Sequence, residues 1–210
     1  AALHALVVRT IKKHKRIIFN GNNYSEEWTK EAAKRGLMNL RNTAEALPCF
    51  VSQKSIDLFA EFGILSESEV HSRYEVKLDK YTKLLNIEAR VMIRMARRTY
   101  LPAISKYMRD LAETITSVKA AIASSDMEEH EKLLSYLVKG TNAVAACTRT
   151  LIAEHDSAEA IEDLQEQAYA YAEKVIPAMD ALRAEIDALE CVVENDYWPV
   201  PTYNDILFYN

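Results

Sequence analysis

The stretch that decides the fold is residues 157–193, SAEAIEDLQEQAYAYAEKVIPAMDALRAEIDALECVV. Its apolar side chains recur at steps of three and four residues, the spacing that places them on one face of an α-helix. Two successive steps of four stand beside Pro177, and such a stutter locally relaxes a left-handed supercoil. The stripe consists of Ile161, Leu164, Ala168, Tyr171, Val175, Met179, Leu182, Ile186, Leu189 and Val193. The pattern predicts a long helix that packs against other helices.

The same spacing begins upstream, at Ser66. Ser66 and Glu69 match a capping box, and a long stretch without Gly follows. Pro102 lacks a backbone donor, so we expect a kink there. The apolar stripe runs through Tyr74, Leu78, Tyr81, Leu85, Ala89 and Met92, then through Ile104, Tyr107, Leu111, Ile115, Val118 and Ile122.

A further helix is predicted after the break at Ser124 and Ser125. Asp126 and Glu129 read as a second capping box, and the helix is expected to end near His155 and Asp156, with Ser157 capping the last one. Its stripe holds Leu133, Leu137, Val144, Cys147 and Leu151. Residues 66–196 are therefore predicted to form an antiparallel, coiled-coil-like bundle with short connections.

Residues 1–65 are more punctuated and read as the edge of a globular domain. A helix over 3–16 is followed by a β-prone piece, residues 17–19, and a turn, residues 20–23. Two short helices are expected next, the first capped by Ser25 and stopped by Gly36, the second capped by Ser52 and stopped by Gly63.

The tail, residues 197–210, has another character. Pro199 and Pro201 favour an extended backbone, and large apolar and aromatic side chains surround them. We expect this tail to dock in a groove of its own subunit or of a neighbour.

Charge is unevenly distributed along the 210 residues. Residues 1–126 carry 21 basic and 14 acidic side chains, and residues 127–196 carry 5 and 16; with Asp205 the sum is +7 − 11 − 1 = −5. The net charge argues against a general nucleic-acid binder. The two segments of opposite sign are expected to pack side by side, although a basic docking face is an alternative.

The sequence lacks an apolar run long enough for a membrane span. Ala1 and the apolar residues after it do not resemble a signal peptide, and we expect the chain to be cut from a longer one.

The residues offer few candidates for chemistry. Glu67, His71 and Glu75 lie four residues apart in turn, which places them on one helix face. They are a weak candidate for a metal site, and the simpler interpretation is a solvated face of paired charges. The basic cluster at residues 12–16 suits a helix end better than a phosphate site. Cys49, Cys147 and Cys191 are expected to be buried free thiols in a reducing cytoplasm. No catalytic, cofactor-binding or metal-binding residue is assigned within this chain.

Three stretches resemble one known family. They are KKHKRIIFNGNNYS at residues 12–25 with Glu27 and Trp28; KRGL at residues 34–37 with later matches at residues 46–48 and 71–75; and YWPVPTY at residues 197–203. In this order they are similar to the C-terminal portion of the type III glutamine synthetases.

The resemblance implies a mainly α chain, with residues 1–65 the end of an α+β catalytic domain, residues 66–196 a helical extension and residues 197–210 a docking tail. It implies a cytoplasmic ATP-dependent glutamate–ammonia ligase using magnesium or manganese, assembled as a homo-oligomer, expected to be a dodecamer. Glutamate and ammonia would be its substrates, with its site residues upstream of Ala1, so the chain alone is expected to be inactive. The alternative is a stand-alone coiled-coil adaptor, which leaves the first and third stretches unexplained.

Overall fold

Residues 2–208 are described by a computed structural model, and all their regular elements are helical. No strand occurs among these residues, which confirms the mainly α prediction for this chain. The α+β catalytic domain implied by the resemblance is not contained in them and stays a prediction. The chain divides into two compact units, Ala1–Ala46 and Leu47–Asn210. The predicted boundary after residue 65 lies further along the chain than this division.

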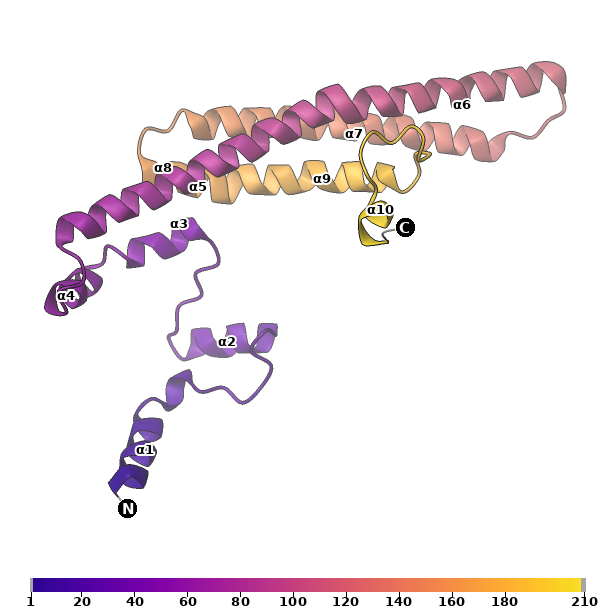
Figure 1. The fold of residues 1–210 in the computed structure, drawn as a ribbon. Helices are drawn as coiled ribbons and strands as arrows, with labels where there is room; N and C mark the ends of the chain where they lie inside the picture. Colours follow the sequence, from indigo (N-terminus) through magenta and orange to yellow (C-terminus); the bar gives the residue numbers. More distant parts are fainter. Residues whose placement is uncertain (1, 209–210) are drawn as a thin grey trace. The chain divides into compact units, whose positions relative to one another are not determined.

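The second unit contains two long helical rods, each interrupted by one π turn, and helix α7 (Glu128–Glu159), which packs against both (Figure 1). In the first rod, helix α5 (Glu67–Met95) continues through the π turn η3 (Ala96–Tyr100) into α6 (Leu101–Ala121). Helix α7 runs back along α6. The second rod consists of α8 (Leu164–Ala170), the π turn η4 (Tyr171–Val175) and α9 (Ile176–Glu190), with α9 along α7 and α8 beside α5. The predicted antiparallel bundle is confirmed.

Most residues of the predicted apolar stripes form the core of the bundle, but Ile122 at the end of one stripe is 58% exposed. Leu182 and Leu189 of α9 meet Leu137, Val144 and Leu151 of α7 in one cluster, all at most 1% exposed. Each such Leu contributes roughly 1.5–3 kcal/mol by leaving water. The basic α5–α6 rod does lie beside the acidic helices, and Lys119 of α6 pairs with Glu131 of α7.

Two of the N-caps predicted from the sequence, Ser52 and Ser66, are confirmed. Ser66 and Glu69 form the capping box of α5, and Ser52 caps α4 (Gln53–Glu61) by accepting from the backbone N–H of Ser55. The second capping box is wrong, because Met127 occupies the N-cap of α7 and Asp126 instead accepts from the backbone N–H of Glu128.

The predicted helix break at Ser157 is also wrong. Helix α7 continues through it to Glu159, because the buried Ala158 holds that last turn against the core. The next helix starts later, where Asp163 accepts from the backbone N–H groups of Gln165 and Glu166. Ser157 has a side chain that favours a helix start, but α7 does not end there, because the packing of Ala158 outweighs this local preference.

Both prolines of the long rods are preceded by a π turn. The N–H of Leu101 donates to the carbonyl of Ala96, and the N–H of Ile176 donates to that of Tyr171, both five residues back. Pro102 and Pro177 have no N–H for the carbonyl four residues earlier, so the wider turn takes up the irregularity. The kink expected at Pro102 and the stutter beside Pro177 both fall at a π turn, and the helix continues beyond each of them (Figure 1).

The first unit contains α1 (Ala2–Lys13), a 3-10 turn η1 (Lys15–Ile17), α2 (Glu26–Lys34) and α3 (Thr43–Ala46). The β-prone reading of residues 17–19 is wrong, since the chain forms this turn and an irregular segment with no strand beside it. Ser25 stands at the N-cap of α2, but its hydroxyl donates to the carbonyl of Asn22 rather than accepting from the helix. Gly36 ends α2 at a φ of 71°, as predicted.

Arg35 holds the first unit together. Its Nη1 donates to the carbonyl of Ile18 at 2.6 Å, and its Nε pairs with Glu31 at 2.7 Å. The guanidinium lies 5.7 Å from the centre of the Trp28 ring, which itself packs on Phe19. One side chain therefore joins the segment after η1 to helix α2.

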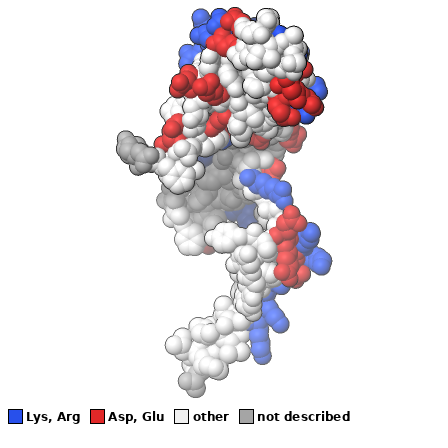
Figure 2. All heavy atoms as spheres, turned by 90° about the vertical axis from the view of Figure 1, so that its right-hand side faces the viewer, with Lys and Arg blue, Asp and Glu red and all other residues white. Residues whose placement is uncertain are grey.

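Helix α1 has no buried residue. Its apolar residues remain exposed, for example Leu3 at 74% and Ile11 at 51%. Figure 2 shows uncharged atoms along one side of α1, at the bottom of the view, and basic atoms along the other. This helix is amphipathic without a partner for its apolar face among the described residues.

Within residues 2–208, none of the helices combines the length and the apolar character that crossing a bilayer requires.

Candidate functional site: the docking site of the C-terminal tail

The tail packs on the bundle of its own chain. Trp198 is 7% exposed and its ring lies 5.2 Å from that of Tyr100, while the Tyr197 ring lies 5.2 Å from that of Tyr107. Val200 also joins the core cluster. Of the two predicted docking places, the structure therefore shows the groove of the same subunit for residues 197–200.

A polar contact fixes the start of the tail. The hydroxyl of Tyr197 donates to Oδ2 of Asp110, whose other oxygen pairs with Arg109 at 2.8 Å. The hydrogen bond from Tyr197, together with Arg109, lowers the pKa of Asp110. The same bond and the loss of solvent raise the pKa of Tyr197. The ionised carboxylate and the neutral phenol are thus the forms that this contact favours.

The tail is not extended to its end. After Pro201, helix α10 (Tyr203–Leu207) begins with a capping box between Thr202 and Asp205. The bond from Thr202 lowers the pKa of Asp205. The wholly extended tail predicted from the two prolines is therefore wrong beyond Thr202, because local capping chemistry restarts a helix there.

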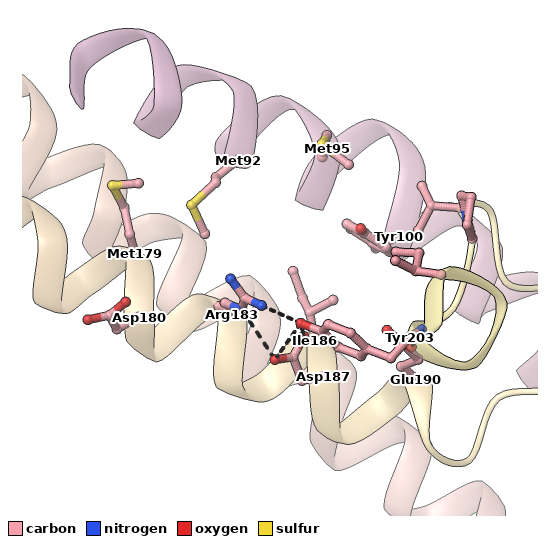
Figure 3. Close-up of a pocket in the computed structure, with 13 residues that line it drawn as sticks. Met92, Met95, Tyr100, Met179, Asp180, Arg183, Ile186, Asp187, Glu190 and Tyr203 are labelled. Carbon is pink, nitrogen blue, oxygen red and sulfur yellow. Dashed lines mark hydrogen bonds and ion pairs between the residues drawn. The ribbon is translucent and has the colours of Figure 1, made fainter. Parts of the chain in front are cut away.

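Helix α10 closes one side of a pocket of about 380 Å³ (Figure 3). Its floor is apolar and includes Met92 and Met95 of the α5 rod and Met179 of α9. Methionine side chains adapt to irregular partners, so such a floor suits an apolar group of variable shape.

The polar rim of this pocket centres on Arg183. Its Nη2 donates to the hydroxyl of Tyr203, and its Nε pairs with Asp187 at 3.4 Å (Figure 3). The backbone N–H of Tyr203 donates to Glu190 at 2.9 Å. Burial raises the pKa of Tyr100 on the opposite wall, and the carboxylates of Glu190 and Asp187 act in the same direction. Helix α9 thus fastens the tail through three side chains that sequence reasoning did not single out.

The end of the tail remains largely exposed among the described residues. Ile206, Leu207 and Phe208 are 65%, 72% and 67% exposed. The tail therefore contacts its own chain with its first half and presents apolar side chains outward with its second.

The other candidate residues do not converge on a site. Among the described residues, the group of side chains close enough to share a metal ion is His155, Asp156 and Glu159, so Glu67, His71 and Glu75 are not brought together. All three cysteines are free thiols. The prediction that they are buried is wrong, because Cys49 and Cys147 are only half-buried and Cys191, at the C-cap of α9, is exposed.

Comparison with known proteins places the chain in a family. The sequence profile of the glutamine synthetase C-terminal domain matches residues 2–119. A glutamine synthetase of Butyrivibrio fibrisolvens is 35% identical over 95% of this chain and 28% of its own length. The type-3 glutamine synthetase of Dictyostelium discoideum is 34% identical over 99% of this chain and 29% of its own length. A glutamine synthetase of Bacteroides fragilis is 31% identical over the same shares.

These matches define a helical chain of the class that forms the C-terminal domain of glutamine synthetases. The chain belongs to the glutamine synthetase family, and the resemblance to the C-terminal part of the type III enzymes is confirmed. It spans less than a third of the length of the relatives it matches.

Proposed function

We propose that this chain is the C-terminal portion of a type III, ATP-dependent glutamate–ammonia ligase, in which it serves as scaffold and assembly surface. The observation that carries the proposal is the match of residues 2–119 to the profile of the glutamine synthetase C-terminal domain, together with 35% identity to a glutamine synthetase over 95% of this chain and 28% of that protein's length. None of the findings favours the alternative, a stand-alone coiled-coil adaptor.

The distribution of exposed apolar side chains supports the scaffold role. The bundle buries its stripe, whereas α1 and the end of the tail leave Leu3, Ile11, Leu207 and Phe208 at least half exposed. Side chains of this size gain stability by leaving water, so faces of this kind are suited to contacts with other parts of a larger enzyme. On this proposal the first unit packs on the catalytic sheet and α10 on a neighbouring subunit.

The reaction of the whole enzyme would join ammonia to the side-chain carboxylate of glutamate at the expense of ATP. Magnesium or manganese would screen the phosphate charge. No residue of this chain is assigned to ATP, to the metal or to the substrates. A cytoplasmic location and a homo-oligomer, expected to be a dodecamer, are parts of the same proposal.

The test starts from the gene. The reading frame upstream of the codon for Ala1 is expected to encode strands rich in carboxylates and arginines. The whole protein is expected to form glutamine from glutamate, ammonia and ATP with magnesium or manganese, while the 210-residue chain forms none. A reading frame that begins at Ala1, or turnover by the 210 residues alone, would overturn the proposal.

The assembly role has its own experiment. Removing residues 204–210 from the whole protein deletes the exposed apolar side chains of α10 but keeps Tyr197 and Trp198 in place. Sedimentation is expected to show smaller oligomers, whereas Arg73→Gln, an exposed change on α5, leaves the assembly unchanged. An unaltered oligomer after the truncation would reject α10 as an assembly contact.

A further inference from the structure

A second hollow of about 550 Å³ lies on the bundle between the α5 rod and the last turns of α7. Four arginines line it, Arg90, Arg94, Arg97 and Arg98. The first two belong to α5 and the last two to the π turn η3. Side chains of α7 form the opposite wall.

None of the four guanidinium groups is within ion-pair or hydrogen-bond distance of a carboxylate of the described residues. Among the described residues, no ion pair or hydrogen bond joins any of them to another side chain or to the backbone, and all four residues are exposed. Their spacing along the rod is i, i+4, i+7 and i+8, which places like charges on neighbouring turns of one face. Such a row is unfavourable by itself, so an anion that lies against it would relieve the repulsion.

The opposite wall contributes His155, Asp156 and Glu159 of α7. His155 is 3% exposed, its Nδ1 faces Asp156 at 3.2 Å, and its buried Nε2 has no hydrogen-bond partner among the residues described. A buried polar atom without a partner is uncommon in folded proteins and marks a wall that is incomplete without a further group.

The balance of charge decides which kind of ion suits the hollow. His155, Asp156 and Glu159 hold ligand atoms within 4.8 Å of one another, a spacing that a cation site would need. However, four arginines against two carboxylates leave the lining at +4 − 2 = +2, without counting the histidine. A cation would meet net repulsion there, whereas an oxyanion would be attracted. One of the two carboxylates, Glu159, is already engaged by the amide of Asn86 at 2.9 Å.

The length of the row indicates how large the anion is. From residue 90 to residue 98 an α-helix rises about 12 Å, which is longer than a single phosphate. Guanidinium groups bind phosphate oxygens through paired N–H donors. Ile93 and Ile152 add an apolar floor between the two charged walls.

From these features we propose that the hollow lined by Arg90, Arg94, Arg97 and Arg98 binds a small molecule carrying a diphosphate or triphosphate group. The arginines contact the phosphate chain, and the π turn η3 supplies two of them. π turns within α-helices occur often at functional sites, which agrees with this placement. The proposal does not depend on the ligase activity proposed above.

The test uses the 210-residue chain and calorimetric titration at fixed ionic strength without divalent metal. Sodium triphosphate and pyrophosphate are expected to bind at least about tenfold more tightly than inorganic phosphate, because they reach more of the row. ATP and sodium triphosphate are compared in parallel, so that tighter binding of ATP identifies a nucleotide and equal binding identifies the phosphate chain alone as the recognised group.

Matched variants locate the site. The double change Arg94→Gln with Arg97→Gln is expected to weaken triphosphate binding at least about tenfold. Arg73→Gln removes an exposed arginine from the same rod, 17 residues before Arg90, and should leave the affinity within about twofold. Circular dichroism and the melting temperature of each variant establish that the bundle is still folded.

Three results would overturn the proposal. The first is the absence of binding heat with triphosphate at millimolar concentration. The second is an equal loss of affinity in Arg73→Gln, which would indicate a diffuse charge effect. The third is loss of self-association in the double variant without any triphosphate binding, which would assign the arginines to an acidic protein surface instead.

Discussion

The two units of this chain achieve order in different ways. The bundle buries a continuous apolar stripe, with Leu137 and Leu182 fully inside. The first unit buries only Ala32 and Ala44 among its described residues and relies on the polar and ring contacts of Arg35. Burial of large side chains makes a region stable by itself, whereas a unit held by a few polar contacts gains most from further packing. The first unit is therefore expected to gain more stability from further packing than the bundle does.

The largest expected effect tests the core side of this comparison. Leu182→Ala should lower the free energy of unfolding by about 3 kcal/mol, because it leaves a cavity between α7 and α9. Leu3→Ala, on the exposed face of α1, should change it by less than about 0.5 kcal/mol. Urea unfolding followed by circular dichroism measures both. Similar losses for the two variants would contradict the contrast between the units.

A second change probes how closely the helices of the bundle approach. A Cβ added at Gly140 of α7 would lie 2.6 Å from Cδ2 of the buried Leu189 on α9. Gly140→Val should therefore destabilise the bundle by about 2 kcal/mol through overpacking.

The control for this change is Asn142→Val, at an exposed position on the same helix, which should shift stability by less than about 0.5 kcal/mol. Chemical denaturation of both variants gives the comparison. A Gly140→Val protein as stable as the parent would show that α7 and α9 separate easily.

A smaller, local effect is expected in the first unit. Arg35→Ala removes the donors to the carbonyls of Ile18 and Arg16 and the cation over Trp28, which should cost about 1 kcal/mol. The chain has two tryptophans, so Trp28 fluorescence in a Trp198→Phe background reports on this unit alone.

In the reverse background, Trp28→Phe, the signal of Trp198 reports on the bundle and should not move. Lys30→Ala, whose side chain is 75% exposed, serves as the matched control. If Arg35→Ala shifted both tryptophan signals equally, the units would unfold as one.

The smallest effect concerns pH and the tail. The pKa of Asp110 is lowered in the folded chain, so its contribution is present above the ordinary value of 3.8 and is lost as pH falls below it towards the folded pKa. The pKa of Tyr197 is raised, so its contribution is complete below 10.0 and is lost as pH rises beyond that value.

Trp198 fluorescence should therefore change at both extremes of pH, and Tyr197→Phe should remove the phenol-dependent part of the change. A flat profile between pH 2 and 11 in the parent would contradict the role of the Asp110 contact.

Much of the bundle could be predicted from sequence because its signals are periodic. Steps of three and four residues identified the buried face from Leu78 to Leu189, and Gly36 and Gly63 marked two helix ends through positive φ. Single-residue signals were less dependable. Ser157 resembles an N-cap, yet the packing of its neighbour Ala158 carries the helix past it.

The candidate sites were harder to foresee. Arg183 and Tyr203 are 20 residues apart, and their contact arises only when the chain turns back after α9. The sequence analysis did not single out the row from Arg90 to Arg98, because the hollow that it shares with α7 depends on how the helices are placed in space. Both sites depend on distances between helices, which the local sequence pattern does not give.

The two π turns also have a consequence for how this chain tolerates changes in length. A π turn holds one residue more than the α-helical turn it replaces, while the helix before it and the helix after it keep their faces aligned. Deleting Pro102 or Pro177 would remove the surplus residue together with the group that disfavours a regular helix. Anywhere else in these rods, the loss of one residue rotates everything beyond it by about 100° and turns the apolar stripe away from its neighbours. Single-residue gaps between related proteins are therefore expected to cluster at these two positions.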